Sequence, residues 1–463
     1  MRRIWIWALA IVVIGAGAFY FAGGDMLLRI ASGATSQNLC SKTFVSGLSP
    51  DEVYAQDMRP EQGMGLIDWA LRYDVDRTAK SVSTTIFGAF PSRAIYREGY
   101  GCTLVYPGAK YLRLPPPAAI DAPSSRSELA GTSVVQATDP QLVRALDRAF
   151  AESEIGPRRW TQAVVVVHGG RVIAERYAPG YGVDTPLLSH SIAKSVLSAL
   201  VGILAREGKL SASSIAPSAR WQSDGDAGDA VSMDQLLRMS SGLPLDEGMG
   251  PGLAQRMWFA EADKAAFAGR TPLVNAPGTA WAYSNLGYEL ASRMVGDAIG
   301  GGPQEIAAFA QRELFAPLGM DGAVIEFDGA GTPSGSNAML ATARVWARFG
   351  LLYLNDGVVD GRRILPEGWV KYSTTPTLDM GYGAGFWLNT TTAPIPVWGR
   401  PWGMPGAPRD AYFARGYLGQ YIVIVPSENL VVVRFGASHI PGGDIEGVGA
   451  LVHDVIEALH AAR

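Results

Sequence analysis

A short apolar run with a serine and a lysine near its start constrains the fold of this chain most strongly. Residues 189–200 read SHSIAKSVLSAL, and no proline follows before residue 217, so the run predicts a buried helix. At this spacing Ser191 and Lys194 share one helix face, about 5–6 Å apart at Cβ. Burial can lower the pKa of the lysine so that its neutral amine accepts the serine proton. The N-terminal end of the helix would also favour negative charge developing near Ser191.

Ser-x-x-Lys is short enough to occur by chance in many chains of this length, so its meaning depends on other segments. The triplet Tyr283-Ser284-Asn285 follows a Pro-Gly turn and precedes a helical pattern that starts at Leu286. A tyrosine on such a loop can project into a cleft, where a nearby lysine favours its ionised form. Asn285 offers both a hydrogen-bond donor and an acceptor.

A third segment, residues 414–420, reads ARGYLGQ and predicts a strand end interrupted by glycine. Gly416 has no Cβ, so another backbone or a substrate can approach it closely. The backbone N–H of Tyr417, the next residue, can then complete an oxyanion hole.

These three segments, in this order, resemble the serine β-lactamase and penicillin-binding superfamily. The Tyr-x-Asn form resembles class C β-lactamases and their esterase relatives. The wording SIAKS with GYLGQ is similar to the 6-aminohexanoate-dimer hydrolase-like (nylon-oligomer hydrolase) branch, and residues 239–243, MSSGL, look like a segment common to the superfamily. The resemblance covers roughly residues 140–463 and implies an α+β, β-lactamase-like fold, with an antiparallel sheet flanked by helices and an inserted, mainly helical body.

The resemblance also implies a role for each residue of the three segments. Ser191 would be the nucleophile, Lys194 and Tyr283 would share the general-base and general-acid work, and Asn285, Gly416 and Tyr417 would contact the substrate or the oxyanion. It implies no cofactor.

The third segment departs from the pattern of the lactam-processing relatives. Those relatives carry Lys-Thr-Gly or His-Thr-Gly on the late strand, where this chain has Ala414-Arg415-Gly416. Adjacent strand residues face opposite ways, so Arg415 does not replace the missing cation at position 414. An ester or a linear amide, as a small molecule or short oligomer, therefore fits better than a β-lactam. A β-lactamase or DD-peptidase, and a non-catalytic ligand-sensing or cell-wall-binding module on the same fold, remain as alternatives.

Composition and motif searches argue against several other classes of function. The net charge of −4 shows no basic excess, which argues against a nucleic-acid partner. There is no Gly-x-Ser-x-Gly elbow, and the five histidines form no His-Glu-x-x-His zinc motif. His190 adjoins the nucleophile but points to another helix face, and we interpret it as structural. The oligomeric state is not predicted.

The N-terminus predicts an export or anchoring segment. Arg2 and Arg3 precede an uncharged apolar run from Ile4 to Gly24, which as a helix would span about 30 Å, the thickness of a bilayer core. We favour an uncleaved single-pass anchor in the inner membrane with the catalytic domain outside the cytoplasm. A cleaved signal peptide and a secreted protein are the alternative.

The remaining chain divides by composition. Residues 25–113 predict a small extracytoplasmic region with short strands, 114–138 a proline-rich linker, and 139–463 the hydrolase domain, behind the segment at 1–24. Cys40 and Cys102 are the only cysteines. In an exported protein such a pair is a disulfide candidate, and two unpaired buried thiols are the alternative.

Overall fold

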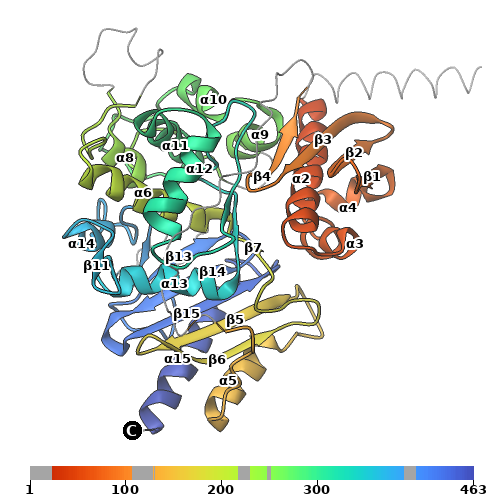
Figure 1. Ribbon diagram of the computed structural model, residues 1–463. Helices are drawn as coiled ribbons and strands as arrows, with labels where there is room; N and C mark the ends of the chain where they lie inside the picture. Colours follow the sequence, from red (N-terminus) through yellow and green to blue (C-terminus); the bar gives the residue numbers. More distant parts are fainter. Residues whose placement is uncertain are drawn as a thin grey trace, which may run out of the picture.

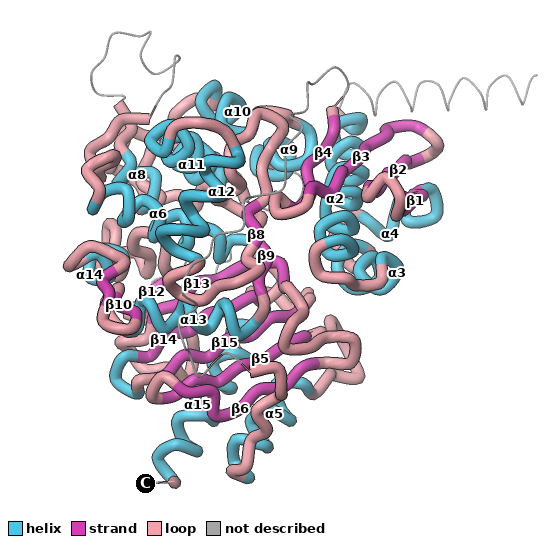
Figure 2. The backbone as a smooth tube through the Cα atoms, in the orientation of Figure 1, coloured by secondary structure: helices cyan, strands magenta, loops and turns pink. Residues whose placement is uncertain are grey.

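The computed structural model describes residues 23–106, 129, 131–216, 230–247, 252–390 and 403–462. A six-stranded sheet with covering helices, a mainly helical body and a smaller N-terminal unit lie side by side (Figures 1 and 2). Two separate clusters of buried apolar residues form the cores, a large one in the sheet and helical body and a small one in the N-terminal unit.

The six-stranded sheet is antiparallel throughout. In spatial order its strands are β12 (Trp387–Leu388), β13 (Tyr412–Gly416), β14 (Gln420–Val425), β15 (Leu430–Gly436), β5 (Thr161–His168) and β6 (Arg171–Tyr177). The central strands read as nearly unbroken apolar runs because both faces of the sheet are covered, and β14 and β15 are buried along their whole length. Chain segments from both ends of the predicted hydrolase domain therefore form one sheet.

Helices cover the two faces of this sheet. On one face α13 (Ala343–Leu354) packs against β14, β15 and β5. On the other face α5 (Pro140–Phe150) and α15 (Ile445–Ala461) pack against each other (Figure 1). The predicted α+β, β-lactamase-like arrangement is confirmed.

The helical body lies between β6 and β12 in the sequence. Its elements are β7 (Leu187–Leu188), η3 (His190–Ile192), α6 (Ala193–Arg206), α8 (Met233–Leu237), α9 (Leu253–Ala260), α10 (Lys264–Arg270), α11 (Asn285–Ile299), α12 (Pro303–Ala310), η5 (Gln311–Phe315), β8 (Val324–Ile325), β9 (Met339–Ala341), β10 (Val358–Val359), β11 (Arg362–Arg363) and α14 (Trp369–Ser373). Strands β7, β9 and β8 pair in a short sheet, in that order. Helices α6 and α8 both pack against α11, which brings the segments around residues 191 and 285 together.

The N-terminal unit is a helix packed on a four-stranded meander. It comprises α2 (Gly24–Phe44), α3 (Pro50–Val53), η1 (Tyr54–Met58), α4 (Met64–Ile67), η2 (Asp68–Ala70), β1 (Leu71–Asp76), β2 (Ser81–Ile86), β3 (Ala89–Arg97) and β4 (Gly101–Val105). Helix α2 also crosses α9 of the helical body. This crossing is close, since a Cβ on Gly33 would lie 2.4 Å from the Phe259 carbonyl oxygen. The predicted boundaries at residues 24, 113 and 138 stay a proposal.

The predicted membrane anchor requires correction. The apolar run on which it rested lies almost entirely outside the described residues. In the described part of the chain, no helix combines the length and apolar character needed to cross a membrane. The first described helix, α2, carries Asp25, Arg29 and Lys42 and buries polar residues against its own sheet. The predicted single-pass inner-membrane location is therefore wrong on this finding, and the described residues do not support membrane contact through an N-terminal helix.

The predicted disulfide is present. Cys40 on α2 and Cys102 on β4 are bonded across 62 positions of sequence, and both are buried in the small core. The bond fastens the helix to the far strand of the meander.

Candidate active site

The turn that carries Ser191 is fixed by its neighbours on both sides. Strand β7 pairs with β9, and the Ser189 N–H donates to the Met339 carbonyl at 2.8 Å. The chain then makes one 3₁₀ turn, η3, and enters the buried helix α6. Ser191 is thus partly exposed and lies just before the N-terminal end of α6, where the sequence predicted it.

The side chain of Lys194 is buried against this serine. Its Nζ lies 2.8 Å from Ser191 Oγ, 2.6 Å from Asn285 Oδ1 and 2.7 Å from the Ser336 carbonyl oxygen. A protonated lysine donates to all three oxygens. A neutral amine can donate to Asn285 and Ser336 and accept the proton of the Ser191 hydroxyl.

Burial sets the protonation of this lysine. Removal from water lowers the pKa of Lys194 from 10.5 to about 8, although the negative charges of Glu247, Asp246 and Glu289 raise it. A substantial part of the amine is therefore neutral near pH 8. Lys194 thus meets the requirement inferred from the sequence, that its pKa be low enough for a neutral amine to act as the base.

Two carboxylates support Asn285 from behind. The Asn285 Nδ2 donates to Asp246 Oδ1 at 2.8 Å and to Glu247 Oε1 at 2.9 Å, which turns its Oδ1 toward Lys194. Asp246 also accepts the N–H of Leu286 at 2.8 Å, and so satisfies a free donor at the start of α11. Burial raises the pKa of Asp246 to about 6. Helix α11 and its first side chain are thus held in register with the lysine.

A second set of hydrogen bonds positions Ser336, whose carbonyl accepts from Lys194. The hydroxyl of Ser336 donates to Glu289 Oε1 and accepts the indole N–H of Trp258 at 2.9 Å. Glu289 is buried, and burial raises its pKa. These contacts fix the carbonyl to which Lys194 donates.

Tyr283 lies in an aromatic cluster at the site. Its ring stacks on Trp387 with centroids 5.4 Å apart, meets Tyr382 edge-on at 6.2 Å, and lies 5.0 Å from the Lys194 Nζ. Burial raises the pKa of Tyr283 well above its usual range, and the Ser191 hydroxyl offsets this only in part. The expectation that the lysine would favour an ionised tyrosine is therefore wrong, because desolvation outweighs the neighbouring charge. Tyr283 keeps its proton near neutral pH.

The end of β13 closes against the nucleophile turn. A Cβ on Gly416 would lie 2.1 Å from the Ser189 carbonyl oxygen, so only glycine permits this approach. The next residue, Tyr417, directs its side chain away from the core, and 56% of the residue is exposed. The structure thus places all six predicted site residues on three segments that meet at Ser191.

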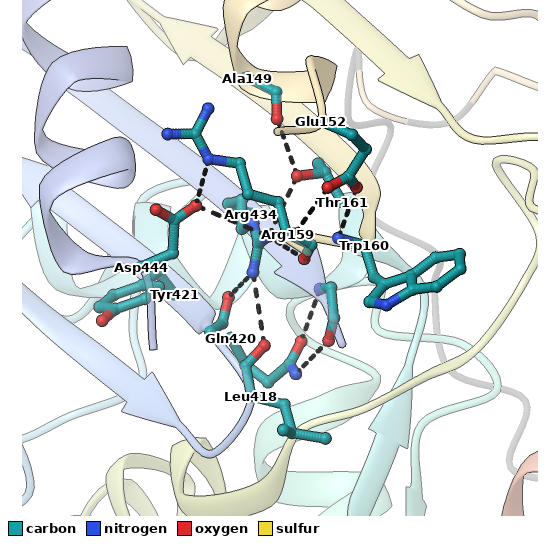
Figure 3. A network of polar contacts seen from close by, with 12 residues as sticks. Ala149, Glu152, Arg159, Trp160, Thr161, Leu418, Gln420, Tyr421, Arg434 and Asp444 are labelled. Carbon is teal, nitrogen blue, oxygen red and sulfur yellow. Dashed lines mark hydrogen bonds and ion pairs between the residues drawn. The ribbon is translucent and has the colours of Figure 1, made fainter. Parts of the chain in front are cut away.

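A buried network holds the turn after Tyr417 from behind (Figure 3). Arg434 donates to the Gly419 carbonyl at 2.7 Å and to Thr161 Oγ1 at 3.0 Å. The Gln420 Nε2 donates to the carbonyls of Tyr417 at 2.9 Å and Gly436 at 2.6 Å. These bonds fix the backbone beside Ser191.

The structure also shows where Arg415 lies in the third segment, which lacks the late-strand lysine or histidine of the lactam-processing relatives. Arg415 donates to the Gly442 carbonyl at 2.9 Å and lies over the ring of Tyr421, its cross-strand partner. Ala414 and Gly416 share the other strand face. The guanidinium is thus turned away from the face that Gly416 presents to the nucleophile turn.

His190, interpreted as structural, is buried beside the site. Its Nδ1 lies 3.3 Å from Asn337 Oδ1, and its ring meets that of Tyr417 edge-on at 5.8 Å. Burial lowers the pKa of His190 to about 3, so the ring is neutral.

Several supporting residues were not predicted from the sequence. Asp246, Glu247 and Ser336 lie outside the three motif segments in sequence and carry no local pattern. The only available signal was the neighbouring segment 239–243, which precedes the two carboxylates.

Comparisons with known proteins identify the family of the chain. The Beta-lactamase family model matches residues 146–447. A 6-aminohexanoate-dimer hydrolase from Paenarthrobacter ureafaciens is 26% identical over an alignment of 296 positions, which covers 60% of this chain and 72% of that protein. The solved structure of a putative 6-aminohexanoate-dimer hydrolase from Bacillus anthracis is similar with a TM-score of 0.52 and 23% identity, over 66% of this chain and 80% of that one. A family VIII carboxylesterase is similar with a TM-score of 0.51 and 16% identity, over 70% and 100% of the two chains. Since the family model covers more than half of the sequence, the chain belongs to the Beta-lactamase family of serine hydrolases, as its motifs predicted.

Proposed function

We propose that the protein hydrolyses a carboxylic ester or a linear amide through an acyl-enzyme on Ser191. The observation that carries the proposal is the 2.8 Å contact between Lys194 Nζ and Ser191 Oγ, together with a lysine pKa of about 8. A buried, partly neutral amine in hydrogen-bond contact with a hydroxyl is the arrangement that a serine nucleophile requires.

The first half-reaction follows from these contacts. Ser191 Oγ attacks the carbonyl carbon as its proton passes to Lys194 Nζ, and the carbonyl π electrons move to the oxygen. The backbone N–H groups of Ser191 and Tyr417 are the proposed donors to this oxyanion. The tetrahedral intermediate then collapses, and the leaving group takes a proton from the Tyr283 hydroxyl, which Lys194 replaces.

The second half-reaction repeats these steps with water. Water attacks the acyl carbon and gives its proton to the Lys194–Tyr283 pair, and Ser191 leaves with a proton returned by that pair. Asn285 holds the lysine in place through both halves because its amide is fixed by Asp246 and Glu247.

Esters and linear amides are better substrates than β-lactams for this site because Arg415 lies on the face of β13 that is turned away from Ser191. Position 414 offers no cation, and the guanidinium of Arg415 bonds to Gly442 instead. The relative named for the 6-aminohexanoate dimer and the neighbour named as a carboxylesterase support the same substrate classes.

Turnover of p-nitrophenyl butyrate, the 6-aminohexanoate dimer and nitrocefin tests the proposal. We expect hydrolysis of the ester or the amide, slower turnover of nitrocefin, and loss of all activity in Ser191→Ala. Ester hydrolysis that persists in Ser191→Ala, or a wild type active only on nitrocefin, would contradict the proposal.

A further inference from the structure

The N-terminal unit lies against the catalytic site. Helix α2 packs against β7, the strand that leads into the Ser191 turn. His439, just beyond β15, donates its Nε2–H to the Gln56 carbonyl of η1 at 2.8 Å. The family model begins at residue 146, so the N-terminal unit lies outside the part of the chain that the family shares.

One side chain of the unit reaches the turn that follows β13. The Tyr417 hydroxyl donates to the Glu61 carboxylate, with both oxygens close at 2.9 and 2.8 Å. The backbone N–H of this same tyrosine is the proposed oxyanion donor. Glu61 precedes Tyr417 by 356 positions in the chain. Its carboxylate would therefore be separated from the carbonyl of a bound substrate by about the length of the Tyr417 side chain.

Within the described residues, no cation is recorded in contact with the Glu61 carboxylate, whose neighbours are the Tyr417 hydroxyl and the negative charge of Asp57. Two cations of the unit are paired elsewhere: Lys42 is buried in an ion pair with Asp57, and Arg59, two positions before Glu61, pairs with Asp68. Arg415 lies on the other face of β13, and His190 is neutral. Glu247 adds a second negative charge, since both it and Glu61 raise the pKa of Tyr417.

We propose that Glu61 is a specificity-determining residue, through which the N-terminal unit selects substrates whose acyl chain is cationic or neutral and disfavours those that carry a carboxylate. This inference rests on the proposed ester or amide hydrolysis and names its substrate class. Two negative charges about 8 Å apart at an effective dielectric constant of about 20–40 oppose binding by roughly five- to thirtyfold, and opposite charges favour it by a similar factor.

Three p-nitrophenyl esters of similar length provide the test. They are the butyrate, the succinate monoester, which is anionic, and the 4-(trimethylammonio)butyrate, which is cationic. Burial raises the pKa of Glu61 to about 7, so kcat/KM is measured near pH 8, where the carboxylate is ionised. The wild type should prefer the cationic ester over the anionic one.

Glu61→Gln removes the charge and retains an acceptor for Tyr417. We expect the cationic-to-anionic ratio of kcat/KM to fall by the product of the two factors, roughly thirty- to a thousandfold, in this variant. Glu98→Gln is the matched control, since it removes an exposed carboxylate from the β3–β4 turn of the same unit, and its ratio should equal that of the wild type. Tyr417→Phe removes the hydrogen bond that lowers the pKa of Glu61, so this variant is compared with the wild type near pH 9, where the carboxylate stays ionised, and its ratio should stay within about twofold.

A salt series on the wild type tests the same charge without any variant. Raising the ionic strength from about 0.02 to 0.5 M should reduce the ratio, because salt screens partly exposed charges. An unchanged ratio in Glu61→Gln, or a wild type that prefers the anionic ester, would overturn the inference while butyrate hydrolysis left the proposed function standing. A wild type that hydrolyses none of the esters and no linear amide would refute the proposed function and this inference with it.

Discussion

Glu247→Gln should move the pH dependence of turnover toward acid. Glu247 raises the pKa of Lys194 by its negative charge, whereas burial lowers it. The free enzyme needs the neutral amine, so kcat/KM rises with pH through the pKa of Lys194, about 8. The substitution removes the charge and retains an oxygen that accepts from Asn285.

The size of the shift follows from the spacing of these groups. Lys194 Nζ lies 2.6 Å from Asn285 Oδ1, and Asn285 Nδ2 lies 2.9 Å from Glu247 Oε1. One amide separates the charges, which places them about 7 Å apart and gives about 2.4 kcal/mol at an effective dielectric constant of about 20. Glu247 is partly exposed, so solvent screening leaves about half of this. Since 1.36 kcal/mol corresponds to one pH unit, the midpoint should fall by about one unit.

The assay is kcat/KM for p-nitrophenyl butyrate between about pH 5.5 and 9.5. At pH 7 the neutral fraction of the amine should rise from about one tenth to about one half, while the alkaline plateau falls because the base is weaker. Glu367→Gln, at an exposed position before α14, is the control for net charge and should leave the midpoint unchanged. A midpoint that stays at its wild-type value or moves to higher pH in Glu247→Gln would refute the assignment of Lys194 as the base.

Three further predictions concern the turn after Tyr417, the missing cation at position 414 of β13 and the disulfide. Gln420→Ala removes the donor to the Tyr417 carbonyl, so kcat should fall about tenfold or more with a smaller change in KM, measured with the same ester; an unchanged kcat would show that the turn holds its position without this bond. Ala414→Lys restores a cation on the site face and should raise nitrocefin kcat/KM by roughly ten- to a hundredfold relative to ester kcat/KM; no gain would mean that the cation does not reach the substrate. Replacing Cys40 and Cys102 by alanine should lower the unfolding free energy of the N-terminal unit by about 2–4 kcal/mol, measured by denaturant titration, because the crosslink closes a loop of 62 positions; an unchanged titration would show that the crosslink adds no stability.

Most of the fold could be predicted because its signals are local. Strands β5, β14 and β15 are mostly apolar runs, and Gly or Pro marks the turns that follow β5 and β14. Helix α2 was missed because it buries small and polar residues, such as Ser36 and Thr35, rather than an apolar stripe. The membrane anchor was inferred from an apolar run that lies almost entirely outside the described residues, and the described helices do not support it.

The site could be predicted only as far as its short motifs reach. The spacing of Ser191 and Lys194 fixed their contact, since both lie within one turn of chain. Glu247, Ser336 and Glu61 could not be predicted, because tertiary packing alone brings them to the site from distant segments. The protonated state of Tyr283 also depends on burial, which the motif does not encode.

Covalent labelling with a fluorophosphonate, followed by peptide mass mapping, tests the central claim most directly. The reagent reacts with serines activated by a neighbouring base. The account predicts one phosphonyl group on Ser191 in the wild type, a rate of labelling that rises with pH around 8, and slow or no labelling in Lys194→Ala. A wild type that stays unlabelled, or a label that maps to another residue, would contradict it.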